Sequence, residues 1–362
     1  MKRVLVAPLD WGLGHATRCI PIIRLLLEQG CTVVLGGSGS SLVLLKAEFP
    51  ELASYALPAY DPQYPGKGSM VWSMARQLPH FITTIRAEHR ALEALVRDHA
   101  IDLVIADNRY GCWSALVPSI FITHQSNILM PQRFGWLAPW VRMANLRSIR
   151  RFTRCWIPDV PGGDSLAGNL ISFGDRRHGL AVEYIGAVSR FKRSAGTVAP
   201  QRYDVVAVCS GPEPQRSVLE ALLLRELEAS DYTFALIRGV VQEKQTIQFV
   251  ADGRGEVINF LPAHALQGCL EQAGTVIARS GYSTVMDMAA LEKKVIFIPT
   301  PGQTEQEYLA TRLKEQGIAF FMPQSNFILT SAFSASNHYT GFAGSRMNDA
   351  LLRQAIEKAL QL

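Results

Sequence analysis

Short apolar runs alternate with helical patterns along the first half of the chain. Residues 3–7, 32–35, 101–106 and 119–123 are the apolar runs, and polar residues follow the last two. Residues 20–30 and 70–96 have apolar positions at helical spacing, and we expect the second helix to break near Pro79. Apolar strands with polar loops at their carboxyl ends are typical of parallel sheets, so this half predicts an α/β domain.

A second alternating series begins near residue 204. The pattern predicts a loop over residues 326–345, where Ser, Asn and Gly are frequent, and a closing helix over 349–361. The remaining elements are strands over 204–209, 233–237, 257–260, 276–278, 295–298 and 318–321, and helices over 215–229, 263–272, 284–292 and 305–316.

The polar segment between the two series predicts a division into domains. Residues 1–190 form an N-terminal Rossmann-like domain, 191–201 a linker, and 202–345 a C-terminal Rossmann-like domain. Residues 346–362 form a terminal helix that we expect to pack back on the N-terminal domain. Two doubly wound α/β domains of this kind are expected to face each other across a cleft, where ligands bind at the carboxyl edges of the sheets.

Composition narrows the class of protein. With 362 residues, 48% hydrophobic and 19% charged, the chain fits two globular domains and excludes disorder. The apolar runs are shorter than the roughly 20 residues of a membrane span, and the first residues predict a strand, not a signal peptide. Six scattered cysteines indicate reduced thiols and a cytoplasmic protein.

Positive charge gathers in the first domain. The segment from Arg133 to Trp156 has six arginines, no acidic residue, and interleaved Trp136 and Trp140. Such a segment favours an anionic partner such as a membrane surface, although solvated arginines on a helix pair would give the same pattern.

Several familiar chemistries have no motif here. The histidines form no HExxH pair, no Asp-x-Asp clamp occurs, and no phosphate loop of the GxxxxGK type is present, so we expect neither a metal nor a resident cofactor. The stretch GLGHAT begins like a dinucleotide fingerprint, but Thr17 replaces its third glycine and no acid follows the second strand.

The turn after the first strand, GLGHATR at residues 12–18, carries a histidine. His15 lies where the next helix begins, and a histidine there can accept a proton from a hydroxyl near neutral pH. A histidine that only bonds within the turn is the competing interpretation. Asp107, at the end of another strand, is the second candidate base.

The second domain has three further turns at strand ends. Ser280 and Gly281 free backbone N–H groups, and Ser283 or Thr284 opens a helix whose amino terminus favours phosphate. Asp287 can accept two vicinal hydroxyls, or it can simply support the helix dipole. After the strand at 295–298, Gln303, Gln306 and neighbouring acids suit sugar hydroxyls, or cap a solvated helix. Ser210 and Gly211, with Arg216 or Arg238, could bind a diphosphate, although surface turns look similar.

These stretches resemble a known family. RSGYSTVMD and FIPTPGQTEQEYLA are similar to the donor-binding region of the family 28 (MurG-like) glycosyltransferases, over about residues 205–321. GLGHATR resembles the GxGHxxR turn of related UDP-sugar hydrolases. The resemblance implies a GT-B fold, a UDP-sugar donor and no metal.

The resemblance also implies roles for individual residues. Asp287 matches a ribose-binding Glu, Gln306 and Glu307 match a Gln-Gln pair that contacts the sugar, and Phe260-Leu261 match a loop that reads uracil. His124 to Asn127 match a His-Glu-Gln-Asn stretch, with Gln125 in place of the Glu. The expected donor site is Gly14, Ser210, Gly211, Arg238, Phe260, Leu261, Arg279, Ser280, Gly281, Ser283, Thr284, Asp287, Gln303, Gln306 and Glu307, and the expected acceptor site is Asn108, His124 and Asn127.

The sequence therefore predicts a glycosyltransferase that moves a hexose or N-acetylhexosamine from a UDP-sugar to a hydroxyl, with inversion. We expect a cytoplasmic protein, peripheral on the inner membrane face, with a lipid-linked or cell-envelope acceptor. Two alternatives stay open: a UDP-sugar hydrolase in which His15 activates water, and a non-enzymatic protein that binds nucleic acid through its arginines.

Overall fold

The computed structural model describes residues 1–62, 70–130, 132–171, 179–192, 200–240, 244–344, 347 and 349–362. The chain divides into two compact units. Unit 1 comprises chiefly Met1–Gln63 and Val71–Arg190, joined by Met347–Leu362 from the end of the chain, and unit 2 comprises chiefly Phe191–Arg346. Part of the expected linker, residues 193–199, lies outside the described residues, as does residue 345 of the expected loop.

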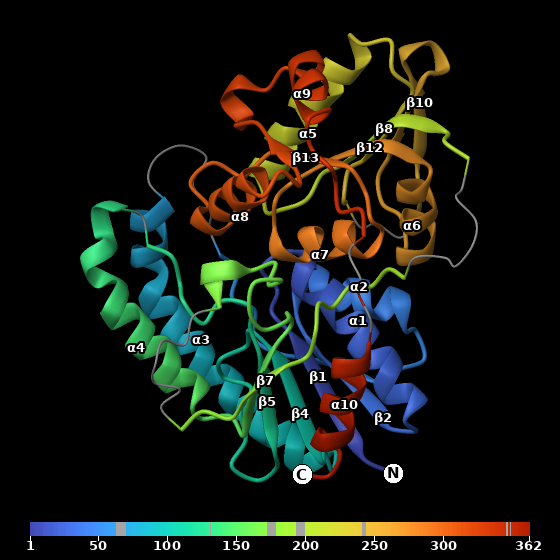
Figure 1. Ribbon diagram of the computed structural model, residues 1–362. Helices are drawn as coiled ribbons and strands as arrows, with labels where there is room; N and C mark the ends of the chain where they lie inside the picture. Colours follow the sequence, from blue (N-terminus) through green and yellow to red (C-terminus); the bar gives the residue numbers. More distant parts are fainter. Residues whose placement is uncertain are drawn as a thin grey trace. The chain divides into compact units, whose positions relative to one another are not determined.

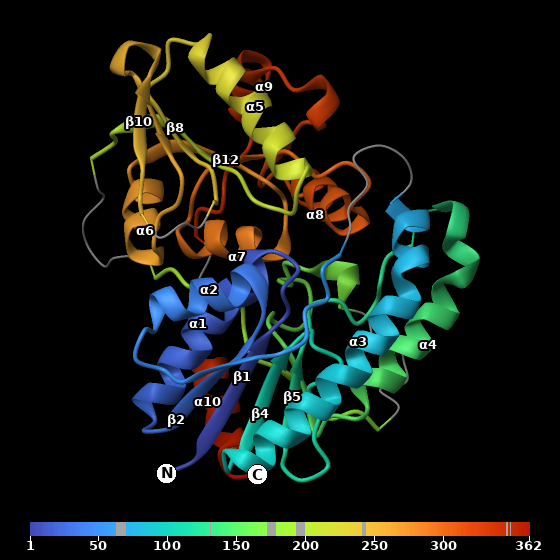
Figure 2. The ribbon, with the colours of Figure 1, turned by 180° about the vertical axis from the view of Figure 1, so that it is seen from behind.

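Unit 1 is built on a seven-stranded sheet in the order β3-β2-β1-β4-β5-β6-β7 (Figures 1 and 2). Every pairing in it is parallel. This is the doubly wound order, in which the connections run to opposite sides on either side of β1 and β4. Ligands bind at that switch point, so loops after β1 and β4 are the first place to look for a site.

The sequence of unit 1 explains these strands, because β1, β4 and β5 are aliphatic and buried on both faces. The short 3₁₀ helices are labelled η. The elements of unit 1 are β1 Arg3–Pro8, α1 Leu13–Glu28, β2 Thr32–Gly37, α2 Gly39–Glu48, β3 Ser54–Ala56, α3 Met70–Asp98, β4 Leu103–Asp107, β5 Ser119–Ile122, η1 Gln132–Leu137, α4 Ala138–Ile149, β6 Arg154–Ile157, η2 Gly168–Leu170, β7 Val182–Tyr184 and α10 Ala350–Ala359.

Helices cover both faces of this sheet. Leu92 and Val96 of α3 and Ile149 of α4 pack in one core with residues of β1, β4 and β5. Helix α1 packs on β1 and β2, with α2 and α10 against it. Two ion pairs hold α10 in unit 1: Arg353 with Glu28 at 3.0 Å, and Lys358 with Glu183 at 2.9 Å.

Unit 2 repeats the architecture with strand order β10-β11-β9-β8-β12-β13-β14, in which only β10 is antiparallel to its neighbour among the described pairings. Helices α5 and α9 pack on one face through Leu219, Leu223, Leu329 and Ala332. Its elements are β8 Tyr203–Val208, α5 Gln215–Glu228, β9 Phe234–Ile237, β10 Ile247–Val250, η3 Ala251–Gly253, β11 Gly255–Ile258, α6 Ala263–Glu271, β12 Ala273–Ala278, α7 Tyr282–Ala290, β13 Val295–Phe297, α8 Thr304–Glu315, β14 Phe320–Phe321, η4 Gln324–Asn326 and α9 Leu329–Ser336.

Two expectations from the sequence were wrong. The stretch 326–345 was expected to be a loop, but it contains α9, whose residues Leu329, Ala332 and Ser336 are buried at helical spacing inside a Ser- and Asn-rich stretch. Helix α3 does not break at Pro79. The carbonyl that loses its partner there belongs to exposed Ala75, where water can replace the missing bond.

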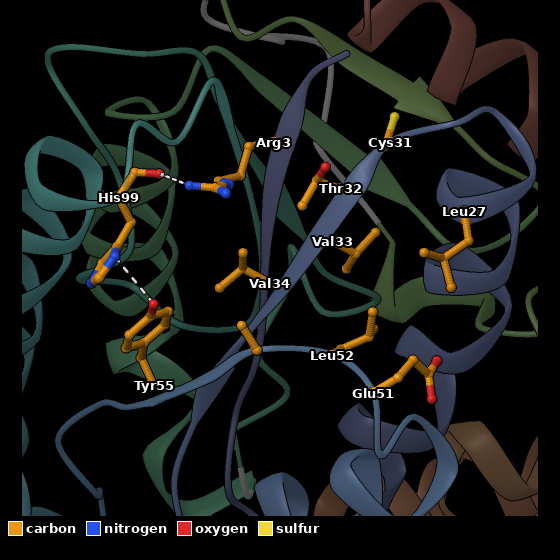
Figure 3. Close-up of a pocket in the computed structure, with 11 residues that line it drawn as sticks. Arg3, Leu27, Cys31, Thr32, Val33, Val34, Glu51, Leu52, Tyr55 and His99 are labelled. Atoms are coloured by element: carbon orange, nitrogen blue, oxygen red, sulfur yellow. Dashed lines mark hydrogen bonds between the residues drawn. The ribbon is translucent and has the colours of Figure 1, made fainter.

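A recess of about 290 Å³ lies at the amino ends of β1 and β2, which begin at Arg3 and Thr32 (Figure 3). Arg3 Nη1 donates to the His99 carbonyl at 2.7 Å, and the Tyr55 hydroxyl lies 3.1 Å from His99 Nδ1. This is the opposite end of the strands from the loops at the switch point, so the recess is separate from the site described below.

No helix in the described part of the chain is both long and apolar enough to cross a bilayer.

Candidate functional site

Three neighbouring strands bring the catalytic candidates of unit 1 together. His15 is the third residue of α1, which follows β1, while Asp107 ends β4 and His124 follows β5. Gly12 makes the turn possible because its φ of 82° is one that side-chain-bearing residues rarely adopt. The His15 side chain is 14% exposed, whereas Asp107 is fully buried.

Arg18 joins these residues into one cluster. It grips Asp107 with two bonds, Nε to Oδ2 at 2.7 Å and Nη2 to Oδ1 at 2.5 Å. His15 Nδ1 lies 2.9 Å from Asp107 Oδ1, and Arg18 Nη1 lies 2.9 Å from Nδ1 of the buried His124. A planar guanidinium can hold a carboxylate and a ring nitrogen at fixed angles, so Arg18 sets the orientation of the whole cluster.

The carboxylate of this cluster stays ionised. Burial alone would raise the pKa of Asp107, but the positive charge of Arg18 and the contact with His15 outweigh it and hold that pKa well below its usual range. Asp107 is buried, and its carboxylate oxygens contact Arg18 and His15. This position suits a carboxylate that orients the His15 ring.

We expect this carboxylate to make stability sensitive to acid. Its pKa is lower in the folded chain than in the unfolded one, so in the window below the ordinary value of 3.8 the unfolded chain binds more protons. Its stabilising contribution is complete above that window and is lost as the pH falls through it. Asp107→Asn, which keeps one oxygen acceptor, should lose less stability than wild type between about pH 5 and pH 3. Denaturant unfolding at both pH values measures this, and parallel losses in the two proteins would contradict it.

A second buried cluster in unit 1 surrounds Arg109. Its Nη1 bonds Glu88 Oε1 at 2.8 Å, its Nη2 bonds Ser38 Oγ at 2.7 Å, and both side chains of the ion pair are fully buried. Glu88 also accepts the Tyr60 hydroxyl at 2.7 Å and the Gly111 N–H at 2.8 Å. The cluster ties α3 to the loops after β1, β2 and β4, which supports the loops that carry the candidate site.

The other expected residues of unit 1 lie in different surroundings. Asn108 follows β4 directly with a φ of 54°, and its N–H bonds the Ile122 carbonyl. Asn127 donates through Nδ2 to the Asn169 carbonyl at 3.2 Å. The Gly14 carbonyl accepts the Thr17 hydroxyl at 2.9 Å within α1. None of these three bonds joins the cluster of His15, Arg18, Asp107 and His124.

In unit 2, the loops after β12 and β13 are bonded to each other. The Ser280 hydroxyl donates to the Gln306 carbonyl at 2.8 Å. The Gln306 side chain accepts the Thr300 N–H at 2.8 Å and donates to Gln303. Glu307 Oε1 accepts the Gly302 N–H at 3.0 Å. The structure therefore gathers these residues at the carboxyl ends of two adjacent parallel strands.

Helix α7 begins at Tyr282, one residue before the earlier of the two expected starts, with Gly281 preceding it. Ser283 and Thr284 therefore lie in its first turn, where N–H groups have no partner within the helix. Asp287 lies further along the same helix and is 7% exposed. After β11, Leu261 is buried and Phe260 half-buried, and Asn259 fixes this turn by accepting the Thr246 N–H at 2.8 Å.

Arg279 ties three loops of unit 2 together. Its guanidinium is buried and donates to the carbonyls of Ile298, Pro299 and Gln215 at 3.0–3.1 Å. A fourth bond reaches Gln324 Oε1 at 2.7 Å. Burial lowers the pKa of Arg279 to about 10, so it stays charged at neutral pH. These four bonds make Arg279 a support for the loops after β12 and β13.

The two arginines expected to neutralise a diphosphate have acidic partners. Arg216 pairs with Glu220 at 2.5 Å and with Glu213, and Arg238 Nε bonds Glu220 Oε1 at 2.6 Å. A diphosphate at Ser210 and Gly211 would therefore compete with Glu220 for Arg238. Gly211, with a φ of 105°, leaves open space where a Cβ would stand.

Reasoning from the sequence missed Arg18 and Glu220 as parts of these sites. Arg18 stands one helical turn after His15, and a buried arginine requires an acid, which the end of β4 supplies. That pairing is visible only once β1 and β4 are known to be neighbours. Among the described residues, no group of His, Cys, Asp and Glu has an arrangement that could hold a metal ion.

Comparison with known proteins relates unit 2 to the family 28 glycosyltransferases, as the sequence motifs did. Residues 212–336 match the glycosyltransferase family 28 C-terminal domain. An uncharacterized glycosyltransferase of Methanosarcina acetivorans is 22% identical over 84% of this chain and 82% of its own length. A UDP-N-acetylglucosamine--N-acetylmuramyl-(pentapeptide) pyrophosphoryl-undecaprenol N-acetylglucosamine transferase of a Methylobacterium strain is 23% identical over 87% of this chain and 82% of its own.

Solved structures extend the likeness to both units. The spinosyn rhamnosyltransferase SpnG, solved with thymidine diphosphate, aligns over all of both chains with a TM-score of 0.63 and 15% identity. At this identity the comparison shows the fold. The chain thus has the GT-B fold and resembles the family 28 glycosyltransferases, whose C-terminal domain its second unit matches.

Proposed function

We propose that this protein transfers a sugar from a UDP-sugar to an acceptor hydroxyl, with inversion at the anomeric carbon and without a metal. The observation that carries the proposal is the cluster in unit 1, where Arg18 and Asp107 hold His15 at the switch point of the sheet. Unit 2, which matches the family 28 C-terminal domain, would bind the UDP-sugar donor. In one step, His15 takes the acceptor's proton, the acceptor oxygen bonds the anomeric carbon, and the bond to UDP breaks with its electron pair.

The cluster supports His15 as the base. Two groups lie near His15 Nδ1: the Asp107 Oδ1 atom, which can only accept a hydrogen bond, and Arg18 Nη2 at 3.0 Å, which can only donate one. Arg18 Nη2 lies closer to Asp107 Oδ1, at 2.5 Å, and therefore donates to that oxygen. The carboxylate is therefore the partner that keeps the proton on His15 Nδ1, which leaves Nε2 with a lone pair. Asp107 then stabilises the imidazolium that forms and acts as a positioning residue.

Unit 2 supports the donor assignment. The N–H groups at the start of α7 and the turn at Ser210 and Gly211 would stabilise the departing diphosphate, because a helix amino terminus carries roughly half a positive charge. Asp287 would accept the ribose hydroxyls. Gln306 and Glu307 would face the sugar from the first turn of α8. The same arrangement supports leaving-group stabilisation by the protein itself, so chelation with EDTA should leave the rate unchanged.

We expect Asp287→Ala to weaken UDP binding by about 10–100-fold, because it removes charge-assisted hydrogen bonds worth roughly 1.5–3 kcal/mol. Calorimetric titration with UDP measures this. His15→Ala should bind UDP as wild type does. Equal losses in both variants would remove the division of labour between the two units.

A hydrolase is the second candidate, because Arg18 completes the GxGHxxR pattern and lies in the cluster. The same Nε2 would then activate water. With donor and no acceptor present, a hydrolase releases free sugar at its full rate in a His15-dependent reaction. A transferase releases it slowly and accelerates when acceptor is added.

A membrane-associated acceptor is the finer part of the proposal. Trp136, Trp140 and Met143 are 71%, 64% and 57% exposed on η1 and α4, beside arginines of the segment from Arg133 to Trp156. The pyrophosphoryl-undecaprenol in the name of the Methylobacterium relative is a lipid acceptor of this kind. We place the protein on the cytoplasmic membrane face, where each basic residue adds about 1 kcal/mol of attraction.

The double change Trp136→Ser and Trp140→Ser should lower partition into vesicles of anionic phospholipid at least tenfold, because two apolar rings no longer insert. Sedimentation at low salt measures this, with neutral phosphatidylcholine vesicles as the control. Equal sedimentation of wild type and variant, or none with either, would count against the membrane assignment.

A further inference from the structure

A second recess in unit 1, of about 280 Å³, is lined mostly by basic and aromatic side chains. Helix α3 borders it, and α3 lies beside α4 in both ribbon views (Figures 1 and 2). Trp113 comes from the loop after β4, and Arg151 stands just beyond the end of α4. The remaining lining residues, all from α3, are Ile85, Arg86, His89 and Arg90.

Stacked rings hold the recess in shape. The imidazole of His89 stacks on the indole of Trp113 with centroids 3.9 Å apart and planes 14° from parallel. His89 Nδ1 lies 3.0 Å from the Trp113 carbonyl, which can only accept, so Nδ1 carries the proton. The Arg151 guanidinium lies 5.5 Å from the centre of the same indole, within cation–π range.

The cations of this recess have no acidic partner in the described part of the chain. Arg86, Arg90 and Arg151 form no ion pair there. Arg90 Nε donates to the Arg86 backbone carbonyl at 3.4 Å. Arg97, two turns further along α3, shows the usual alternative, since it pairs with Glu93. Three cations that converge without a carboxylate make a field that favours a bound anion.

The three guanidinium groups also indicate which kind of anion fits the recess. Arginine forks match the oxygens of a phosphoryl group in geometry as well as charge.

We propose that this recess binds a phosphoryl group attached to an apolar or aromatic moiety. Arg86, Arg90 and Arg151 would hold the phosphoryl oxygens, while Ile85 and the Trp113 ring contact the apolar part. The ligand is either a free phosphorylated small molecule or the headgroup of a phospholipid. This site stands apart from the transfer reaction, because it shares no residue with the sites proposed for donor or base.

The test uses the full chain and phenyl phosphate as the probe, with inorganic phosphate and uncharged phenol beside it. The indole N–H resonance of Trp113, assigned with Trp113→Phe, reports on this recess because the Trp113 side chain lines it. Excess UDP keeps the donor site occupied. We expect phenyl phosphate to shift this resonance saturably and phenol to leave it in place.

The double change Arg86→Gln and Arg151→Gln should weaken phenyl phosphate binding at least tenfold. Arg97→Gln, on the same helix outside the recess, is the matched control and should bind within twofold of wild type. Asp287→Ala should also bind the probe normally, which separates this site from the donor site. An unshifted Trp113 resonance, or a double variant that binds as wild type does, would overturn the proposal.

Vesicles distinguish the two sources of the phosphoryl group. Arg133→Gln with Arg147→Gln removes two other arginines of the segment from Arg133 to Trp156 and controls for general attraction to anionic vesicles. If the natural ligand is a headgroup, phosphatidylglycerol vesicles bind the Arg86 and Arg151 double variant at least tenfold more weakly than this control. If it is a free phosphorylated molecule, both double variants bind vesicles equally and differ only toward phenyl phosphate. If the Arg86 and Arg151 double variant matches wild type toward both probes, the recess is not a phosphoryl site.

Discussion

Replacing His15 by alanine should lower the rate of sugar transfer by about 10²–10⁴-fold, the usual contribution of a general base. UDP binding should stay within a few-fold of wild type, because His15 belongs to unit 1 and every donor candidate except Gly14 belongs to unit 2. Initial rates of UDP release with saturating donor measure the effect. His338→Ala, at an exposed position in unit 2, is the matched control and should retain full activity.

The partners of His15 make this prediction sharper. Asp107→Asn should also lower the rate, since an amide does not stabilise an imidazolium as a carboxylate does. A His15→Ala protein that turns over at the wild-type rate would remove the histidine from the mechanism. Loss of UDP binding in that protein would indicate a structural role.

The largest loss of stability is expected for Arg109→Ala. It leaves Glu88 buried without its cation, and breaking one partner of a buried ion pair typically costs about 3–5 kcal/mol. Burial raises the pKa of Glu88 even with Arg109 present. Without Arg109 the carboxyl group should take up a proton more readily still, so the variant should lose stability as the pH rises through that raised pKa.

Equilibrium unfolding in denaturant, at about pH 5 and pH 8, measures this loss. Arg225→Ala is the matched control, because its side chain is 70% exposed and pairs with Glu226 at the surface. That change should cost less than about 1 kcal/mol at either pH. Similar costs for the two variants would mean that the Arg109 cluster does not support unit 1 as argued.

Most of the strands and helices of both units could be predicted from the sequence. Largely apolar strands such as β4 and β12, each followed by a polar or glycine-containing turn, indicate parallel sheets even when their neighbours in the sheet are not known. The sequence did not predict helix α9, because four of its eight residues are Ser or Thr and only three of the eight are buried. Tertiary packing of that short stripe on the unit 2 core overrides the local preference for a loop.

The site was recognised in part. His15 and Asp107 stood out because each follows or ends an apolar strand, and the structure places them 2.9 Å apart. Arg18 did not stand out, since its role depends on β1 and β4 being neighbours in the sheet, which no local pattern states. The same holds for Glu220, whose pairing with Arg216 and Arg238 joins the start of α5 to the end of β9.

The most direct test of the central claim is incubation of the full chain with a panel of UDP-, TDP-, GDP- and CMP-sugars. Nucleotide and free sugar are measured with and without a lipid-linked acceptor. TDP-sugars belong in the panel because SpnG was solved with thymidine diphosphate. The predicted result is His15-dependent release of UDP from one UDP-sugar, accelerated by acceptor. If no nucleotide binds, or if release is unchanged in His15→Ala, the proposed reaction is wrong.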